Sequence, residues 1–140
     1  MMRKHIIADI KNMNLHQKVS YCVDTIPYLL DNCSDCIDLD LSDIESVVDH
    51  KGSLHIYEVL DDGSLESILS YSKDLSIGLR DTKAVLMCMT SKKEIPAQVL
   101  SGYTEFIEGF LEQDATFIFG TSFNKTEIQT DTRITIVFVH

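Results

Sequence analysis

Two stretches near the end of the chain, Ala115-Thr116-Phe117-Ile118-Phe119 and Arg133-Ile134-Thr135-Ile136-Val137-Phe138-Val139, decide the fold. Both are rich in β-branched and aromatic residues, and the second has a two-residue alternation, so each predicts a β-strand. The segment between them, residues 120–131, is polar and is interpreted as a long hairpin connection. Because no crossover helix separates the two strands, we expect them to be antiparallel neighbours in one sheet.

The rest of the chain predicts alternating helices and strands. Ser42-Asp43-Ile44-Glu45 is a capping box that starts a short helix, and Pro27 is expected to kink or end the helix before it. The continuous apolar run 84–89 is typical of a central strand covered on both faces. A helix over residues 96–111 is expected to face the core from Val99 onward. The other predicted elements are helices over residues 15–30 and 65–79 and a strand over residues 54–60.

The predicted order of elements is α-α-β-α-β-α-β-β. It describes an α+β fold, a two-layer arrangement in which helices pack on a mixed sheet of about four strands. A chain of 140 residues fits one domain, and its 44% hydrophobic and 24% charged composition is ordinary for a globular protein. We expect a single domain over residues 15–140, preceded by an N-terminal arm over residues 1–14.

The charge of the chain is acidic but uneven. The formal net charge of −10 argues against nucleic acid or an anionic membrane surface as the main partner. Residues 1–18 run against this trend, with a net charge of +3. The residues responsible are Arg3, Lys4, Lys11 and Lys18 against the single carboxylate of Asp9. We interpret this basic head as a solvated terminus, with a small docking arm as the alternative.

No apolar run reaches the roughly 18 residues that a membrane helix needs, and early charged residues argue against a signal peptide. We therefore expect a cytoplasmic protein with reduced thiols. Cys33 and Cys36 form a lone Cys-x-x-Cys pair, which could be half of a zinc site with His50 or His55, or a redox pair. A structural zinc site needs four ligands, and there is no second cysteine pair, so we expect neither metal nor cofactor. The five histidines show no cluster spacing.

The segment Asp38-Leu39-Asp40-Leu41-Ser42-Asp43 places three carboxylates directly before the predicted short helix. Taken alone, acids at this position stabilise the helix N-terminus through caps and the helix dipole. A second interpretation is a small α+β enzyme or ligand-binding domain that holds a divalent metal ion on Asp38, Asp40 and Asp43.

Several motifs in this order resemble the C-terminal domain of the FtsZ/tubulin family, which includes the bacterial cell division protein FtsZ. Phe117-Ile118-Phe119-Gly120-Thr121 resembles the family's Ile-Ile-Phe-Gly-Thr/Ala, and Arg133-Ile134-Thr135-Ile136-Val137 resembles its Arg-Val-Thr-Val-Ile. Residues 35–44 are similar to the family's synergy loop, Gly-Leu-Ile-Asn-x-Asp-Phe-Ala-Asp-Val. The two family carboxylates fall on Asp40 and Asp43. The chain departs from the family at Asp38, where the family has asparagine, and at Asp35, where it has glycine.

The resemblance implies a function for the acidic loop. In the family, this loop of one subunit orients the water that attacks the γ-phosphate held by the next subunit, and such positioning is what phosphoryl transfer needs. Asp38, Asp40 and Asp43 are therefore candidate synergy-loop residues. The expected partner is the nucleotide face of an FtsZ-like GTPase domain or subunit, and self-association is a further possibility. Direct membrane binding and nucleic-acid binding are not expected.

The family's phosphate loop is the motif that this sequence does not contain. Of its six glycines, no two lie closer than seven residues apart, so they cannot form a cradle of consecutive backbone N–H groups. We expect the chain to have no nucleotide site of the family's kind and no enzymatic activity in isolation. It would at most supply GTPase-activating carboxylates in trans to a neighbouring subunit.

Overall fold

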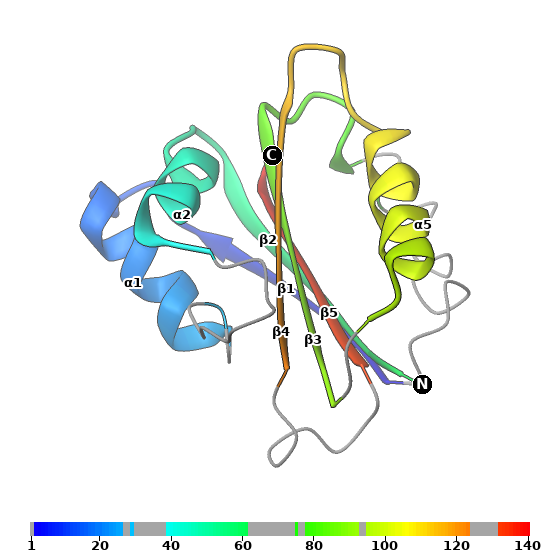
Figure 1. The fold of residues 1–140 in the computed structure, drawn as a ribbon. Helices are drawn as coiled ribbons and strands as arrows, with labels where there is room; N and C mark the ends of the chain where they lie inside the picture. The colour runs from blue at the N-terminus through cyan, green and yellow to red at the C-terminus, as the bar shows by residue number, and fades with distance from the viewer. Residues whose placement is uncertain are drawn as a thin grey trace.

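The computed structural model describes residues 2–26, 29, 39–61, 75, 78–92, 95–123 and 132–140. Within them, a five-stranded mixed sheet is covered by helices (Figure 1). The strands are β1 (Met2–Asp9), β2 (Ser53–Asp61), β3 (Ala84–Ser91), β4 (Thr116–Phe123) and β5 (Thr132–Val139). The helices are α1 (Leu15–Thr25), α2 (Leu41–Val48) and α5 (Ala97–Glu108).

The strands lie in the order β1-β2-β5-β3-β4. Strand β5 is antiparallel to both β2 and β3, whereas β4 runs parallel to β3 at one edge. The prediction that β4 and β5 are neighbours is therefore wrong. Strand β5 is buried along nearly its whole length, as expected for a strand at the centre of the sheet. Strand β4 is half-buried and lies at the edge. Helix α5 connects β3 to β4, and this crossover allows the two strands to be parallel.

The first strand was not predicted. Residues 2–9, which the sequence analysis assigned to an N-terminal arm, form β1 and pair antiparallel with β2 from Met2↔Leu60 to Asp9↔Ser53. Ile6 packs against the core, while the neighbouring Ile7 is 60% exposed because successive side chains point to opposite faces of the sheet. Arg3 and Lys4 of the basic head thus lie in an edge strand of the sheet rather than in a solvated arm, whereas Lys11 lies in the turn after β1 and Lys18 in α1.

Helices cover both faces of the sheet, so the fold has three layers rather than the expected two (Figure 1). Helices α1 and α2 pack on one face, where the core includes Val19, Ile44, Val48, Leu86 and Val137. Helix α5 packs on the other face. Core residues on that side are Tyr57, Leu75, Leu79, Val85, Met87, Tyr103, Ile107, Ile136 and Phe138. The apolar run of β3 is buried throughout, which confirms it as a strand covered on both faces.

Local sequence signals explain most helix boundaries. Asn14 and Gln17 form a reciprocal capping box that starts α1. Helix α1 ends at Thr25 because Ile26, the residue before Pro27, is extended, as residues before proline prefer. Helix α5 buries Tyr103 and Ile107.

One expectation about α5 was wrong, and one predicted helix cannot be compared with the described residues. Val99 in α5 was expected to face the core but is 37% exposed. The predicted helix over residues 65–79 falls mostly outside the described residues, although Leu75 and Leu79 are fully buried against the α5 side of the sheet. In the described part of the chain, no helix has both the length and the apolar character needed to cross a bilayer.

Candidate functional site

The acidic turn at the start of α2 is a closed capping arrangement. Asp40 is the N-cap, and its Oδ1 accepts a hydrogen bond from the backbone N–H of Asp43 at 3.0 Å. In return, Oδ2 of Asp43 accepts a hydrogen bond from the backbone N–H of Asp40 at 2.9 Å. The hydroxyl of Ser42 donates to Oδ1 of Asp40 at 2.7 Å. The helix therefore begins two residues earlier than predicted, with Asp40 and Asp43 in the capping roles expected of Ser42 and Glu45.

The apolar residues around this turn fix its position. Leu39 precedes the cap and Ile44 follows four residues after it, and both are buried in the core beneath α1 and α2. These are the two positions of a hydrophobic staple, which sets the angle at which the chain enters a helix. Leu41 lies between the two capping carboxylates in sequence and is 52% exposed. The buried side chains of Leu39 and Ile44 thus anchor the turn to the core, while Asp40 and Leu41 are exposed.

The electrostatics of the turn keep Asp40 ionised. Hydrogen bonds from the Ser42 hydroxyl and then from the Asp43 N–H lower the pKa of Asp40 below its ordinary value. One oxygen of each capping carboxylate is used inside the turn. The second oxygens are Oδ2 of Asp40 and Oδ1 of Asp43. These two oxygens are able to accept hydrogen bonds from a water molecule or a partner.

The remaining predicted site residues are only partly placed. Asp38, Cys33 and Cys36 lie outside the described residues, so the divalent-metal and zinc hypotheses stay predictions. Among the described residues, no group of three or more histidine, cysteine or acidic side chains could hold a metal ion. Cys22 and Cys88 are buried free thiols, and burial raises the pKa of Cys22 to about 12, which makes that thiol a poor nucleophile.

The fold brings together histidines that are far apart in the sequence. Nε2 of His5 lies 3.2 Å from Nδ1 of His55, and the His55 ring stacks on Phe138. The rings of His140 and His55 meet edge-on. Burial, and then the neighbouring His5 and His140, lower the pKa of His55. The cluster arises because β1, β2 and β5 are adjacent, and no sequence spacing could have indicated it.

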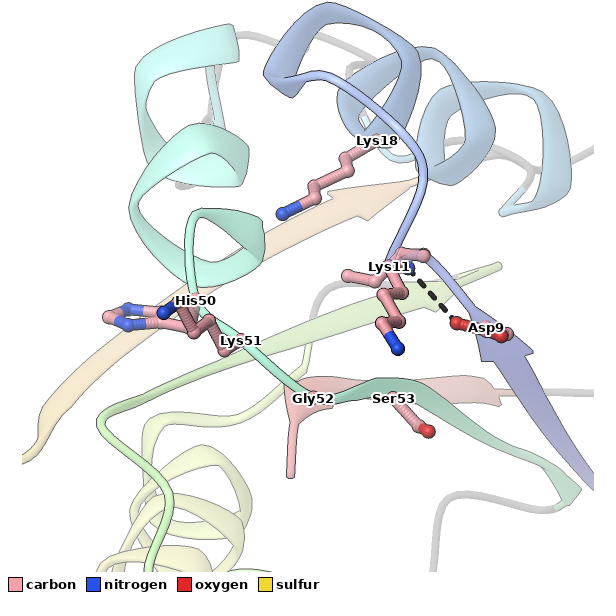
Figure 2. A pocket seen from close by; sticks show the side chains of 8 residues that line it. Asp9, Lys11, Lys18, His50, Lys51, Gly52 and Ser53 are labelled. Carbon is pink, nitrogen blue, oxygen red and sulfur yellow. Dashed lines mark hydrogen bonds between the residues drawn. The ribbon is translucent and has the colours of Figure 1, made fainter.

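A pocket of about 650 Å³ lies at the opposite end of α2 from the acidic turn. It is formed by three separate segments: the end of β1 with the turn after it, the first half of α1, and the connection from α2 to β2. The lining residues are Asp9, Ile10, Lys11, Lys18, His50, Lys51, Gly52 and Ser53. In Figure 2 the Lys11 side chain extends toward the Gly52–Ser53 segment and the Lys18 side chain extends toward the end of α2, whereas His50 points away from both.

The pocket is basic in an otherwise acidic protein. Three lysines and one aspartate give it a net charge of +2, in a chain with a net charge of −10. The Asp9 carboxylate accepts a hydrogen bond from the backbone N–H of Lys11 at 3.0 Å. Within the described residues, no carboxylate lies in ion-pair distance of Lys11, Lys18 or Lys51. Two of these lysines belong to the basic head noted in the sequence, which was the one available signal for this site.

The mixed sheet and its helices form an α+β fold, and comparison with known proteins shows which known domain has a similar fold. No protein-family model and no curated protein matches the sequence. Among solved structures, the chain resembles an empty FtsZ dimer from M. jannaschii with a TM-score of 0.63 and 14% sequence identity. It also resembles the W319Y mutant of FtsZ from the same organism with a TM-score of 0.59 and 15% identity.

These matches cover 81% of this chain but only 34% and 35% of the two FtsZ chains. The chain therefore has the fold of the C-terminal domain of FtsZ and spans about a third of the length of the proteins that it resembles. The fold that the motifs near Gly120 and Arg133 implied is confirmed.

Proposed function

We propose that this chain is an FtsZ-type interaction module that takes part in, or regulates, the assembly of an FtsZ-like cytoskeletal GTPase in cell division. The observation that carries this proposal is the structural likeness to one third of FtsZ, in the domain that bears the acidic loop. We further propose that the module has no nucleotide site of the family's kind and acts on a GTPase domain supplied by another subunit.

The acidic turn supports this proposal through its chemistry. Asp40 is held in its charged form, and the reciprocal capping bonds use only one oxygen of Asp40 and one of Asp43. A fixed carboxylate of this kind can orient a water molecule for attack on a phosphate, the role that the family gives to its loop. Because the capping bonds lock both side chains to the backbone, the carboxylates would meet a partner already positioned.

The exposed side chain of Leu41 supports a contact at the same place. It stands between the two capping carboxylates in sequence and is 52% exposed, while Leu39 before it is buried. An apolar side chain surrounded by acids can fill a small pocket on a partner while the acids form the polar rim of the contact. The partner that fits the resemblance is the nucleotide face of an FtsZ-like GTPase domain.

The test is GTP hydrolysis by the cognate FtsZ-like GTPase, measured as phosphate release while this chain is titrated in, with binding measured in parallel. Asp40→Asn and Asp43→Asn keep a capping acceptor but remove the charge, so they separate catalysis from folding. We expect each to weaken stimulation of hydrolysis more than it weakens binding. Glu45→Gln, on the exposed side of the same helix, is the matched control and should behave as wild type.

Two further variants sharpen the test. Asp38→Asn restores the family's residue and removes one negative charge near the phosphates, so it should if anything improve stimulation. Leu41→Ser should weaken binding, whereas Val99→Ser, an exposed apolar position on α5, should not. If the wild-type chain neither binds the GTPase nor alters its hydrolysis, the proposed function fails although the fold stands.

A further inference from the structure

The lysine pocket at the far end of α2 has no role in the function proposed above. Lys51 has a simple structural explanation, because a cation near the carboxyl end of a helix interacts favourably with the helix dipole. Lys11 and Lys18 have no such explanation. They come from the turn after β1 and from the first half of α1, and they extend toward one space from two sides (Figure 2).

Lys18 is the more informative of the two lysines. It is half-buried, and no described carboxylate lies in ion-pair distance of its ammonium group. The methylene stem of a half-buried lysine packs on the protein while its ammonium group stays accessible, so that group is able to donate hydrogen bonds to an anion. The one carboxylate in the lining, Asp9, is hydrogen-bonded to the backbone of Lys11. The ammonium group of Lys18 is therefore able to bind an anion that enters the pocket.

We infer that this pocket binds a small molecule through a phosphate group, held between the ammonium groups of Lys11 and Lys18. A phosphate monoester carries a charge of about −1.5 to −2 at neutral pH, which matches two ammonium groups, whereas a single carboxylate would neutralise only one. The volume of about 650 Å³ lies within the range of small-molecule sites, so it leaves room for more than the phosphate. Gly52 and Ser53 line the rest of the space and present little bulk to the ligand.

The site differs from the nucleotide site of the FtsZ/tubulin family. It uses two lysine side chains rather than a glycine-rich backbone cradle, and among the described residues of its lining the one aromatic ring is that of His50, which points away. It therefore recognises phosphate without selecting a nucleobase. This inference does not depend on the proposed function, because Lys11 and Lys18 lie at the opposite end of α2 from the acidic turn.

Pyrophosphate is the probe for the test, titrated calorimetrically into the full chain at fixed ionic strength. We expect saturable binding to the wild-type chain, weakened about tenfold by either Lys11→Gln or Lys18→Gln, since a charge-assisted hydrogen bond contributes about one such factor or more. The matched control is Lys83→Gln, because Lys83 is an exposed lysine that does not line the pocket. It should bind pyrophosphate as the wild type does.

The contrary results are also definite. If the wild-type chain does not bind pyrophosphate, or if all three variants bind it equally well, the inference is wrong. It is also wrong if a polyglutamate peptide binds more tightly than pyrophosphate, because the pocket would then serve an acidic chain. Sedimentation with vesicles containing phosphatidic acid distinguishes a lipid headgroup from a soluble phosphate ligand. If the wild-type chain binds the vesicles and Lys18→Gln does not, the ligand is a lipid headgroup. If the wild-type chain does not bind the vesicles, the ligand is soluble.

Discussion

Asp40 and Asp43 cap each other: each carboxylate accepts a hydrogen bond from the backbone N–H of the other residue, at 3.0 and 2.9 Å. The same two residues are the candidate synergy-loop carboxylates. One pair of side chains thus has a structural role that is visible in the chain itself and a proposed role toward a partner. The first role can be measured without the partner.

The structural role predicts an order of stabilities. Asp40→Ala removes the N-cap and leaves the Asp43 N–H without its acceptor, so it should lower the denaturant midpoint of the chain. Asp40→Asn keeps an acceptor and should remain close to wild type. Glu45→Ala, an exposed position on the same helix, is the control and should also remain close. Equal stability of Asp40→Ala and wild type would show that the cap contributes nothing.

The histidine cluster predicts a loss of stability on mild acidification. His55 has a lowered pKa, so below its unfolded value near 6.5 the unfolded chain binds more protons than the folded chain. The stability is therefore fully present above that pH and falls as the pH drops below it. Urea unfolding between pH 7.5 and 5 measures this slope. His55→Phe, which can still stack on Phe138, should flatten it, whereas His16→Gln on the exposed side of α1 should leave it unchanged.

The backbone conformation of Gly52 predicts that adding a single methyl group there lowers the free energy of unfolding. Its φ is +139°, and an added Cβ would lie 2.8 Å from the backbone carbonyl of His140. Gly52→Ala should therefore destabilise the chain by about 1–3 kcal/mol or more. The same substitution at Gly109, where the nearest atoms are 3.5 Å away and the backbone is helical, should be tolerated. Equal unfolding free energies for the two variants would contradict this account of Gly52.

Strand β1 predicts different effects for two adjacent isoleucines. Ile6 packs against the core on the α1 side, while Ile7 is 60% exposed. Ile6→Ala should lower the free energy of unfolding by about 1–2 kcal/mol, and Ile7→Ala should change it by less than about 0.5 kcal/mol. If both substitutions were neutral, β1 would behave as the solvated arm that the sequence first suggested.

The sequence predicted what depends on local patterns. The apolar run of β3, the alternation in β5 and the order of elements between α1 and β5 follow from residue periodicity. Strand β1 was missed because the consecutive residues Arg3, Lys4 and His5 are charged or polar and only a short apolar stretch follows them. The place of β5 between β2 and β3 was missed because strand order depends on burial across the whole sheet.

The candidate sites also differ in how far the sequence could predict them. The acidic turn is contiguous in sequence, so its residues were found, although the cap was placed on Ser42 rather than Asp40. The histidine cluster and the lysine pocket combine residues that are up to about 135 positions apart, from His5 to His140. Only the net charge of +3 in the first 18 residues indicated any part of the pocket in advance.

The most direct test of the central claim is the amount of FtsZ-like polymer that sediments in the presence of GTP and increasing amounts of this chain. A module that offers the loop face but no nucleotide face can join one end of a filament and leave no surface for the next subunit. We therefore predict a fall in polymer mass at substoichiometric amounts of the chain, with the chain present in the pellet. Unchanged polymer mass, with no chain in the pellet at equimolar amounts, would contradict the account.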